Sequence, residues 1–412
     1  MDMNLTVMQT LALAIAGMCH ALIGSVKVPL SKQLNIPESR IGQLISVFGF
    51  TLIPMAFAAG YFADTQGRNL VVEAGFILVI VSVIVLATLK TYNMALVSIL
   101  LLGTGWSALV NVLNALQGPA FLSEADVSAD NLPFAMNLGD FIFGMGAFLM
   151  PIVITFMIKK VGLKQTFFSF AVVTAVPLAL CFTIDLDEFV NRFAELKDPP
   201  AATTESSVGD PQPDTAVGEL GFTDLFTDSV VILCCIAFFF HVPVEACVGA
   251  WATTLMIDRG TAESKATGLL SLFWFTFTVS RLIAALALPD GSHELAIIAM
   301  AVILLAVVYG LITSKNAGKT NVLVLGAGLI LGPIFPILIA FLVGHVDVSL
   351  QGRAIGLFFC IGGIGWAIVP YLVGRKADKS GLQNSFYIVA GCVVGLIVFS
   401  SLLVYKISAL HA

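Results

Sequence analysis

Twelve long apolar runs constrain the fold of this chain more than any other feature of its sequence. They are centred near residues 18, 52, 80, 106, 146, 175, 240, 277, 303, 333, 363 and 395. The hydrocarbon core of a bilayer is about 30 Å thick and requires about 20 apolar residues per helix, which each run supplies. The runs are continuous rather than alternating, which argues against a β-barrel. Helices satisfy every backbone polar group in lipid, so the sequence predicts an all-α membrane protein with twelve transmembrane helices.

The composition agrees with a chain whose partner is the lipid bilayer. Hydrophobic residues make up 58% of the 412 residues and charged residues only 11%, whereas soluble domains carry about 25% charged residues. The cysteines all lie in apolar runs, with no disulfide framework and no metal-ligand spacing. The sequence contains no G-x-S-x-G motif, no Walker loop and no basic region suited to nucleic acid. We therefore expect no enzyme activity, no cofactor, no metal and no nucleic-acid partner.

The runs divide into two sets of six. Residues 1–186 carry the first set, residues 228–412 carry the second, and residues 187–227 are rich in Asp, Glu, Pro, Ser and Thr, which predicts a flexible acidic linker. The fifth and eleventh runs share six identities at a constant offset of 219 residues: Gly144 with Gly363, Gly146 with Gly365, Pro151 with Pro370, Gly162 with Gly381, Leu163 with Leu382, and Phe167 with Phe386. This repetition predicts two pseudo-symmetric six-helix bundles, the arrangement of transporters that move about a midplane site.

A short polar stretch, Gly60-Tyr61-Phe62-Ala63-Asp64-Thr65-Gln66-Gly67-Arg68, joins the second and third runs. Its glycines allow two helix ends to approach closely, Asp64 can accept bonds from the N-terminus of a neighbouring helix, and Arg68 can clamp a carboxylate. The stretch resembles the G-x-(x)-x-D-x-x-G-R loop between helices 2 and 3 of major facilitator superfamily transporters. That resemblance implies a gating role for Gly60, Asp64, Gly67 and Arg68. For Arg281, at the end of the eighth run, we expect a role in gating or in contacts between the two halves. A polar turn without function is the alternative.

Further segments resemble the fucose–proton-symporter-like sugar transporters of that superfamily. They are the eleventh run with its loop (residues 362–381), Phe335-Pro336, Ser280-Arg281, and residues 242–251 of the seventh run. Two positions depart from that group, because Ser25 and Ala108 stand where the fucose symporter carries an aspartate and a glutamate. Neither its substrate nor its proton coupling therefore transfers to this chain.

Ionisable side chains in mid-membrane are costly to insert, by about 2.5–3.5 kcal/mol, and usually face a partner or an aqueous cavity. Glu245, in the seventh run, has His241 one helical turn before it. We expect Glu245 to couple transport to a cation and His241 to bind substrate; a neutral pair that joins two helices is the alternative. Asp140 is the second candidate for coupling, with an anchoring role at its helix end as the alternative.

Polar and aromatic side chains in other runs are candidate substrate ligands. Asn111, Asn114 and Asn137 can donate to and accept from hydroxyl groups, although amides also join transmembrane helices. His20 lies 221 residues before His241 and is a further candidate, with simple packing as the alternative. Trp274 and Trp366 could stack on sugar rings or serve as interfacial anchors.

The loop charges conflict with the topology that the resemblance implies, in which both termini and the linker are cytoplasmic. Of the 20 lysines and arginines, only Arg68, Arg192, Lys197, Arg281, Arg353 and Lys406 fall in the even-numbered loops and the C-terminus. The positive-inside rule would invert the protein, whereas a basic funnel for an anionic substrate would reconcile the charges with the family orientation.

These observations predict a secondary transporter that works by alternating access as a monomer in the inner (cell) membrane of a bacterium. We expect it to move a small polar solute, with a sugar favoured, coupled to a proton rather than to a sodium ion. An exporter of amphipathic or anionic compounds is the first alternative, and a membrane sensor that binds without transport is the second.

Overall fold

The structure is a computed structural model that describes residues 2–36, 38–197, 222–289 and 291–411. The described residues form helices joined by short turns, with no strand among them, and twelve helical spans are long and apolar enough to cross a membrane. The first six spans are α1 (Met3–Leu34), α2 (Glu38–Gln66), α3 (Arg68–Ala87), α4 (Tyr92–Ala115), α6 (Leu132–Val161) and α7 (Leu163–Cys181). The last six are α9 (Ser229–Ile257), α10 (Glu263–Ala287), α11 (His293–Thr313), α12 (Ala317–Leu331) with α13 (Ile334–His345), α14 (Gln351–Ser380) and α15 (Leu382–His411). The predicted all-α membrane fold is confirmed.

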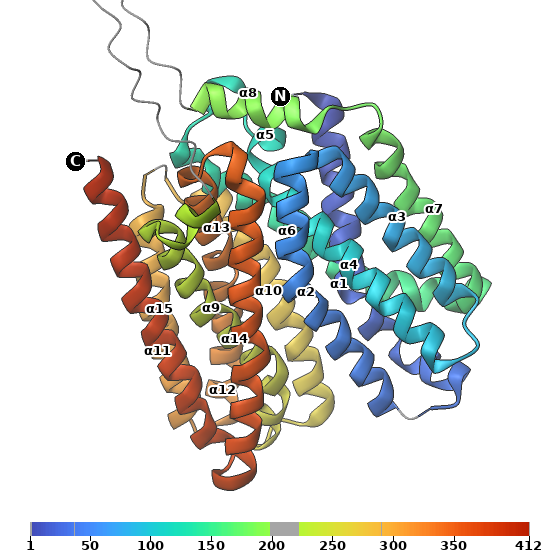
Figure 1. Cartoon of the computed structure of the whole chain (residues 1–412). Helices are drawn as coiled ribbons and strands as arrows, with labels where there is room; N and C mark the ends of the chain where they lie inside the picture. Colours follow the sequence, from blue (N-terminus) through green and yellow to red (C-terminus); the bar gives the residue numbers. More distant parts are fainter. Residues whose placement is uncertain (1, 37, 198–221, 290, 412) are drawn as a thin grey trace, which may run out of the picture.

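The helices form an N-terminal group, α1–α7, and a C-terminal group, α9–α15 (Figure 1). We call the end that carries α5 (Gln117–Phe121), α8 (Leu186–Lys197) and both chain ends the linker end, and the opposite end, with the turns at Gly162 and Gly381, the far end. The groups meet mainly through α2 against α14 and α6 against α10. Figure 1 shows α2 and α14 side by side near the linker end and further apart towards the far end.

The sequence repeat corresponds to equivalent packing in the two groups. Gly146 faces the backbone carbonyl of Ala14 in α1, and Gly365 faces that of Phe239 in α9, so a Cβ at either glycine would overlap backbone. α6 and α14 therefore lie very close to the first helix of their own group. The repeated glycines Gly162 and Gly381 have φ of 86° and 82° and end α6 and α14 with the left-handed turn that glycine permits.

Their neighbours in the repeat face the opposite group. A Cβ on Gly144 of α6 would lie 2.6 Å from Thr278 of α10, and a Cβ on Gly363 of α14 would lie 2.8 Å from Ile53 of α2. The spacing Gly-x-Gly thus directs one glycine to the helix's own group and the other to the partner group. This explains why the same short pattern occurs in both halves of the chain.

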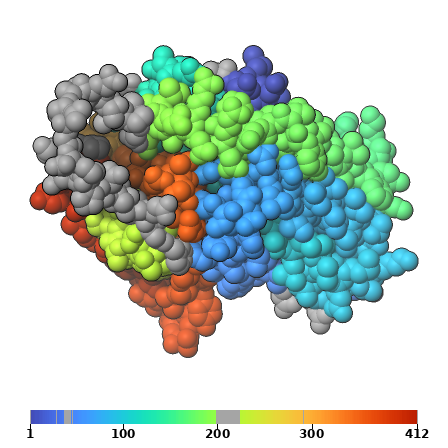
Figure 2. Space-filling model, turned by 45° about the horizontal axis from the view of Figure 1, so that its top comes forward, coloured from blue at the N-terminus to red at the C-terminus, as the bar shows by residue number. Residues whose placement is uncertain are grey.

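The segment expected to be a flexible linker begins with a helix. α8 is amphipathic, with Leu186 and Val190 buried, and Asp185 accepts hydrogen bonds from the backbone N–H groups of Asp187 and Glu188 at its first turn. Its apolar stripe packs against the linker end, which composition alone did not reveal. Figure 2 shows α8 lying across this end. Residues 198–221, the greater part of the expected linker, lie outside the described residues.

Candidate functional site

Asp64 joins the two groups at the linker end. Its carboxylate is fully buried and accepts hydrogen bonds from the backbone N–H groups of Gly352 (2.8 Å) and Arg353 (2.9 Å), the first turn of α14, and from Arg353 Nε (3.0 Å). The positive end of the α14 dipole adds to the attraction for the carboxylate. These three bonds connect α2 to α14 and therefore depend on contact between the two groups at the linker end.

Arg68 connects three segments of the same end. Its guanidinium donates to Asp187 of α8 (2.8 Å) and to the backbone carbonyl of Val348 (2.8 Å) in the short helix η4 (Val348–Leu350) of the C-terminal group. The carboxylate it pairs with is therefore supplied by α8. Gly67, with φ of 97°, directly precedes α3, and a Cβ on it would lie 2.9 Å from the same Asp187 carboxylate. Gly60 lies directly against Gly352, where a Cβ would overlap the Gly352 carbonyl.

Arg281 lies at the centre of a cluster of ionisable side chains. It is buried, it donates from Nε to the carbonyl of Gly332 (3.1 Å) and from Nη1 to the carbonyl of Asp140 (3.1 Å), and its guanidinium lies over the Phe277 ring. Pro336 has no N–H to offer Gly332, four residues earlier, so Arg281 satisfies a carbonyl at the break between α12 and α13. His20, Asp140, His241 and Glu245 all lie within electrostatic range of Arg281.

Glu245 faces this cluster rather than lipid. Its carboxylate lies 3.8 Å from His241 Nε2, and its side chain is 28% exposed while that of His241 is fully buried. Among the described residues neither ring nitrogen of His241 has a hydrogen-bond partner. A buried polar atom without a partner is costly, which makes this imidazole a candidate for binding a group that enters the site.

Asp140 brings a second carboxyl group to the cluster from the N-terminal group. The residue is buried, and its Oδ2 has no hydrogen-bond partner among the described residues. Arg281 donates to the backbone carbonyl of Asp140, not to its carboxyl group. The cluster therefore combines two carboxyl groups, from α6 and α9, with one guanidinium from α10.

Three of the predicted aromatic ligands, His20, Trp274 and Trp366, have exposed side chains. His20 is exposed to solvent and lies stacked near Trp106 (5.3 Å between ring centroids), with Phe143 5.9 Å away. Trp274 is 39% exposed and packs against Gly249, one turn beyond Glu245 on α9. Trp366 is 38% exposed and packs against Gly49 of α2, across the two groups. Exposed ring faces thus come from both groups.

The three asparagines donate hydrogen bonds to backbone carbonyls. Asn114 donates to the carbonyl of Val110 and Asn137 to that of Pro133, each on its own helix. Asn111 donates to the carbonyls of Ala56 and Gly352, one in each group. All three are buried.

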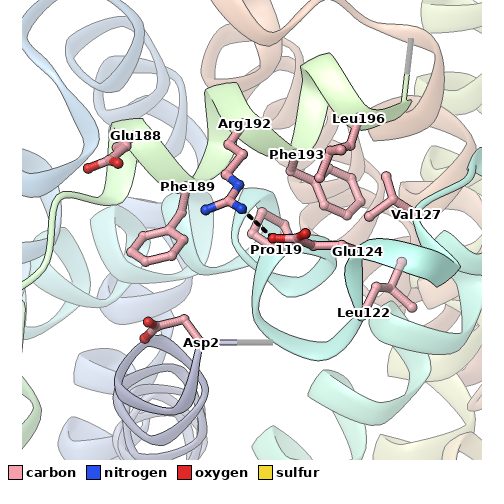
Figure 3. Close-up of a pocket in the computed structure, with 10 residues that line it drawn as sticks. All are labelled: Asp2, Pro119, Leu122, Glu124, Val127, Glu188, Phe189, Arg192, Phe193 and Leu196. Carbon is pink, nitrogen blue, oxygen red and sulfur yellow. Dashed lines mark hydrogen bonds and ion pairs between the residues drawn. The ribbon is translucent and has the colours of Figure 1, made fainter. Parts of the chain in front are cut away.

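A crevice of about 260 Å³ opens at the surface of the linker end, beneath α8 (Figure 3). Arg192 of α8 points towards Glu124 and pairs with it there. The lining residues are Asp2, Pro119, Leu122, Glu124, Val127, Glu188, Phe189, Arg192, Phe193 and Leu196. None belongs to the Arg281 cluster, so the crevice is separate from the candidate central site.

Sequence reasoning missed two residues of the closed end. Arg353 and Asp187 supply the partners of Asp64 and Arg68, but they lie 289 and 119 residues away along the chain. The signal available for Arg353 was the glycine before it, Gly352, at the start of an apolar run. For Asp187 the signal was its position in the first turn of an amphipathic segment.

Buried charges between two groups of helices that meet at the linker end are typical of membrane transporters that work by alternating access. The sequence model described as "Major Facilitator Superfamily" matches residues 10–370. The chain belongs to this superfamily, whose members are transporters and not enzymes.

Known proteins of similar sequence and solved structures of similar fold match most of this chain. "Bypass of stop codon protein 6" of Saccharomyces cerevisiae is 22% identical over 78% of this chain and 66% of its own length. A "Glucose/galactose transporter" of Brucella abortus is 25% identical over 73% of this chain and 69% of its own length. In structure, the human organic anion transporter MFSD10 superposes with a TM-score of 0.71 at 16% identity, over 97% of this chain and 100% of that one. The E. coli fucose:proton symporter FucP superposes with a TM-score of 0.70 at 14% identity, over 96% of this chain and 97% of that one. At these identities the solved structures establish the fold.

Proposed function

We propose that this transporter moves a small polar solute, with a sugar as the favoured class, and that Glu245 couples the movement to a proton. Residues 1–186 and 228–412 would rock against each other as two bodies joined by residues 187–227. The observation that carries the proposal is the position of Glu245: it is partly exposed, it contacts His241, and it shares Arg281 with Asp140 of the opposite group. A carboxyl group is costly in a membrane and is retained where it has a function.

The surroundings of Glu245 favour a proton over a sodium ion. A sodium site requires several oxygen ligands, as other hard cations do, whereas Glu245 has an imidazole 3.8 Å away and a guanidinium within electrostatic range, with Asp140 as the second carboxyl group near it. When Glu245 loses its proton, its carboxylate competes with the Asp140 carbonyl for Arg281. Deprotonation would thus weaken the bond from Arg281 to the opposite group and favour opening of the linker end.

Three features support a sugar as the solute. The unpartnered nitrogens of His241 and the unpartnered Oδ2 of Asp140 suit hydroxyl groups, which both donate and accept. The exposed faces of Trp274, Trp366 and His20 suit the apolar faces of a sugar ring. The relatives with a named solute include a glucose/galactose transporter, and the similar folds include a fucose symporter.

The test is transport by the purified chain in liposomes, with labelled D-glucose, D-galactose and L-fucose as probes. We expect Glu245→Gln to abolish concentrative uptake driven by a pH gradient and to spare counterflow exchange, because exchange needs no net proton movement. Glu263→Gln, an exposed carboxylate at the far end, is the matched control and should transport as the wild type does. Concentrative uptake at the wild-type level by Glu245→Gln contradicts the coupling role.

An anionic or amphipathic solute is the second candidate, because Arg281 is bonded to carbonyls and forms no ion pair with a carboxylate among the described residues. The far end also carries most of the bases, and the fold resembles an organic anion transporter. Inhibition of uptake by hydrophobic anions but not by sugars would favour this class. Binding of a probe without flux in the same liposomes would instead indicate a sensor.

We further propose that the chain acts as a monomer in the bacterial cell membrane with its linker end in the cytoplasm, as the family topology implies. Each group supplies one carboxyl group to the cluster, and Arg281 lies between the two groups. One copy thus contains a complete candidate site.

A further inference from the structure

Asn111 of α4 carries the only amide side chain that the hydrogen bonds of the described residues place between backbone carbonyls of both groups. Its Nδ2 donates to Ala56 O of α2 at 3.0 Å and to Gly352 O of α14 at 3.0 Å, and the side chain is fully buried. Ala56 belongs to the same group as Asn111, whereas Gly352 belongs to the other. Both donor positions of the amide nitrogen are therefore used within the protein.

We propose that Asn111 is a clamp: its bond to Gly352 forms when the linker end is closed and favours that closed state. In this role Asn111 is not a ligand of the solute. This inference rests on the proposed alternating-access function and assigns a positioning role within it. The Nδ2 group has no donor left for a hydroxyl group, and the residue lies beside the contact between α2 and α14. The expectation that Asn111 binds substrate is replaced by this role.

The bond to Gly352 depends on how closely the two groups approach. Gly60 lies against Gly352, where a Cβ on either residue would meet the carbonyl of the other, and a Cβ on Gly356 would lie 2.7 Å from Ala56 O. These glycines bring the two carbonyls within reach of one amide group. A separation of α2 from α14 by about 1 Å would take the 3.0 Å bond beyond the usual range for N–H···O bonds.

The C-terminal group contains a counterpart. Arg281 donates to Gly332 O of its own group and to Asp140 O of the opposite group. The cross-group acceptors thus lie on α14 and α6, the two helices that share the glycine and proline repeat. Asn111 and Arg281 thus each reach across to a backbone carbonyl of the corresponding helix in the other group.

The energy of the Asn111 contact is also small enough for the contact to break. Asn111 Oδ1 has no hydrogen-bond partner among the described residues, and an unsatisfied buried acceptor offsets part of the gain from the two bonds. An amide that was fully satisfied in the closed state would oppose opening more strongly. The orphaned oxygen therefore fits a contact that forms and breaks in each transport cycle.

The experiment measures the distance between spin labels at Thr183 and Leu295, which lie at the linker end of α7 and α11, in protein whose seven native cysteines have been replaced. We expect Asn111→Leu to raise the ratio of open to closed linker end by about threefold, the effect of one average hydrogen bond between transmembrane helices. Ser107→Ala is the matched control, since Ser107 is buried on α4 but bonds only Gly103 O of its own helix. It should leave the ratio unchanged.

A second variant separates a clamp from a local packing defect. A Cβ on Gly352 would lie 2.5 Å from Gly60 O and 2.6 Å from an Asp64 oxygen, so Gly352→Ala should open the linker end. Asn111→Leu should then add no further shift, because its cross-group bond is already lost. If Asn111→Leu does not fold, Asn111→Ser serves in its place, since the shorter side chain cannot reach both carbonyls.

The outcomes distinguish the clamp from the function on which it rests. An equal shift by Asn111→Leu with and without Gly352→Ala, or no shift in either background, overturns the clamp. A wild-type distance that never changes with pH or with added D-glucose, D-galactose or L-fucose contradicts the proposed transport cycle instead. Loss of sugar binding by Asn111→Leu at an unchanged distance would restore Asn111 as a ligand and also overturn the clamp.

Discussion

Replacing Asp64 with asparagine should open the linker end, because Asp64 supplies its most heavily bonded contact between the two groups. The carboxylate accepts three bonds across the interface, from two backbone N–H groups and one guanidinium nitrogen, at 2.8–3.0 Å. Asparagine has nearly the same shape but offers one oxygen in place of two. The NH₂ group of the asparagine would face N–H donors of Gly352 or Arg353 and could not accept from them. The charge that strengthens all three bonds would also be absent.

The magnitude follows from the difference between charged and neutral bonds. A hydrogen bond to a charged group contributes about 1.5–3 kcal/mol, and one between neutral groups contributes about 0.5–1.5 kcal/mol. A loss of about 1 kcal/mol for each of the three bonds gives about 3 kcal/mol, with the first-turn position on α14 adding a smaller dipole contribution. This corresponds to a shift of about 100-fold in the ratio of open to closed linker end.

The assay is the Thr183–Leu295 spin-label distance, measured in Asp64→Asn and in the control Asp185→Asn. Asp185 also accepts two backbone N–H bonds at a helix start on the same surface, but both come from the first turn of α8, directly after it in the chain, and not from the C-terminal group. The control should keep the wild-type distance, and Asp64→Asn should lengthen it. An Asp64→Asn protein with the wild-type distance distribution would show that these bonds do not set the equilibrium.

Two further predictions concern other parts of the molecule. The hydrogen bond from His345 (3.0 Å), supported by two backbone N–H bonds, lowers the pKa of Asp228 from 3.8 to about 2 against the effect of partial burial. The ionised form stabilises the fold above pH 4 and its contribution is lost as pH falls from 4 towards 2, so the fall in Tm over this range should be smaller in Asp228→Asn than in the wild type. In intact cells, cysteines introduced at Gln66 and at Gln212 should react with a membrane-permeant maleimide and not with an impermeant one. Reaction with the impermeant reagent would show that the loop charges, and not the family topology, set the orientation.

The sequence predicted the twelve spans and the chemistry of the polar stretch from Gly60 to Arg68, because both depend on local properties. Apolar runs of membrane length leave few alternatives to helices, and the structure places Asp64 against a helix N-terminus as its charge predicts. The partner helix could not be predicted from the loop alone, because α14 begins 287 residues after Asp64 (351 minus 64). Helix α8 was missed for a related reason: its apolar stripe is short, and the acidic, proline-rich segment after it dominates the composition.

The central cluster was predicted in part. Glu245 and His241 share a helix, so their spacing predicted a pair, and the structure places them 3.8 Å apart. Asp140 and Arg281 were identified as single residues with different roles, yet the structure joins them through a backbone carbonyl. A side chain that binds a backbone carbonyl leaves no partner residue type in the sequence, because every residue has that carbonyl.

The same argument explains why Asn111 could not be distinguished from a solute ligand by its sequence. An amide that binds a hydroxyl group and one that binds carbonyls are chemically identical; what differs is whether two backbones approach closely enough to use both donors. That approach is encoded at other positions, by Gly60, Gly352 and Gly356, whose missing Cβ atoms let α2 and α14 touch. The glycines set the distance between α2 and α14. The polar side chains stabilise the closed linker end in particular, since the bonds from Asp64 and Asn111 to α14 form only when the glycine contacts do. A larger residue at any of these glycines should therefore weaken both bonds together, although neither bond involves a glycine side chain.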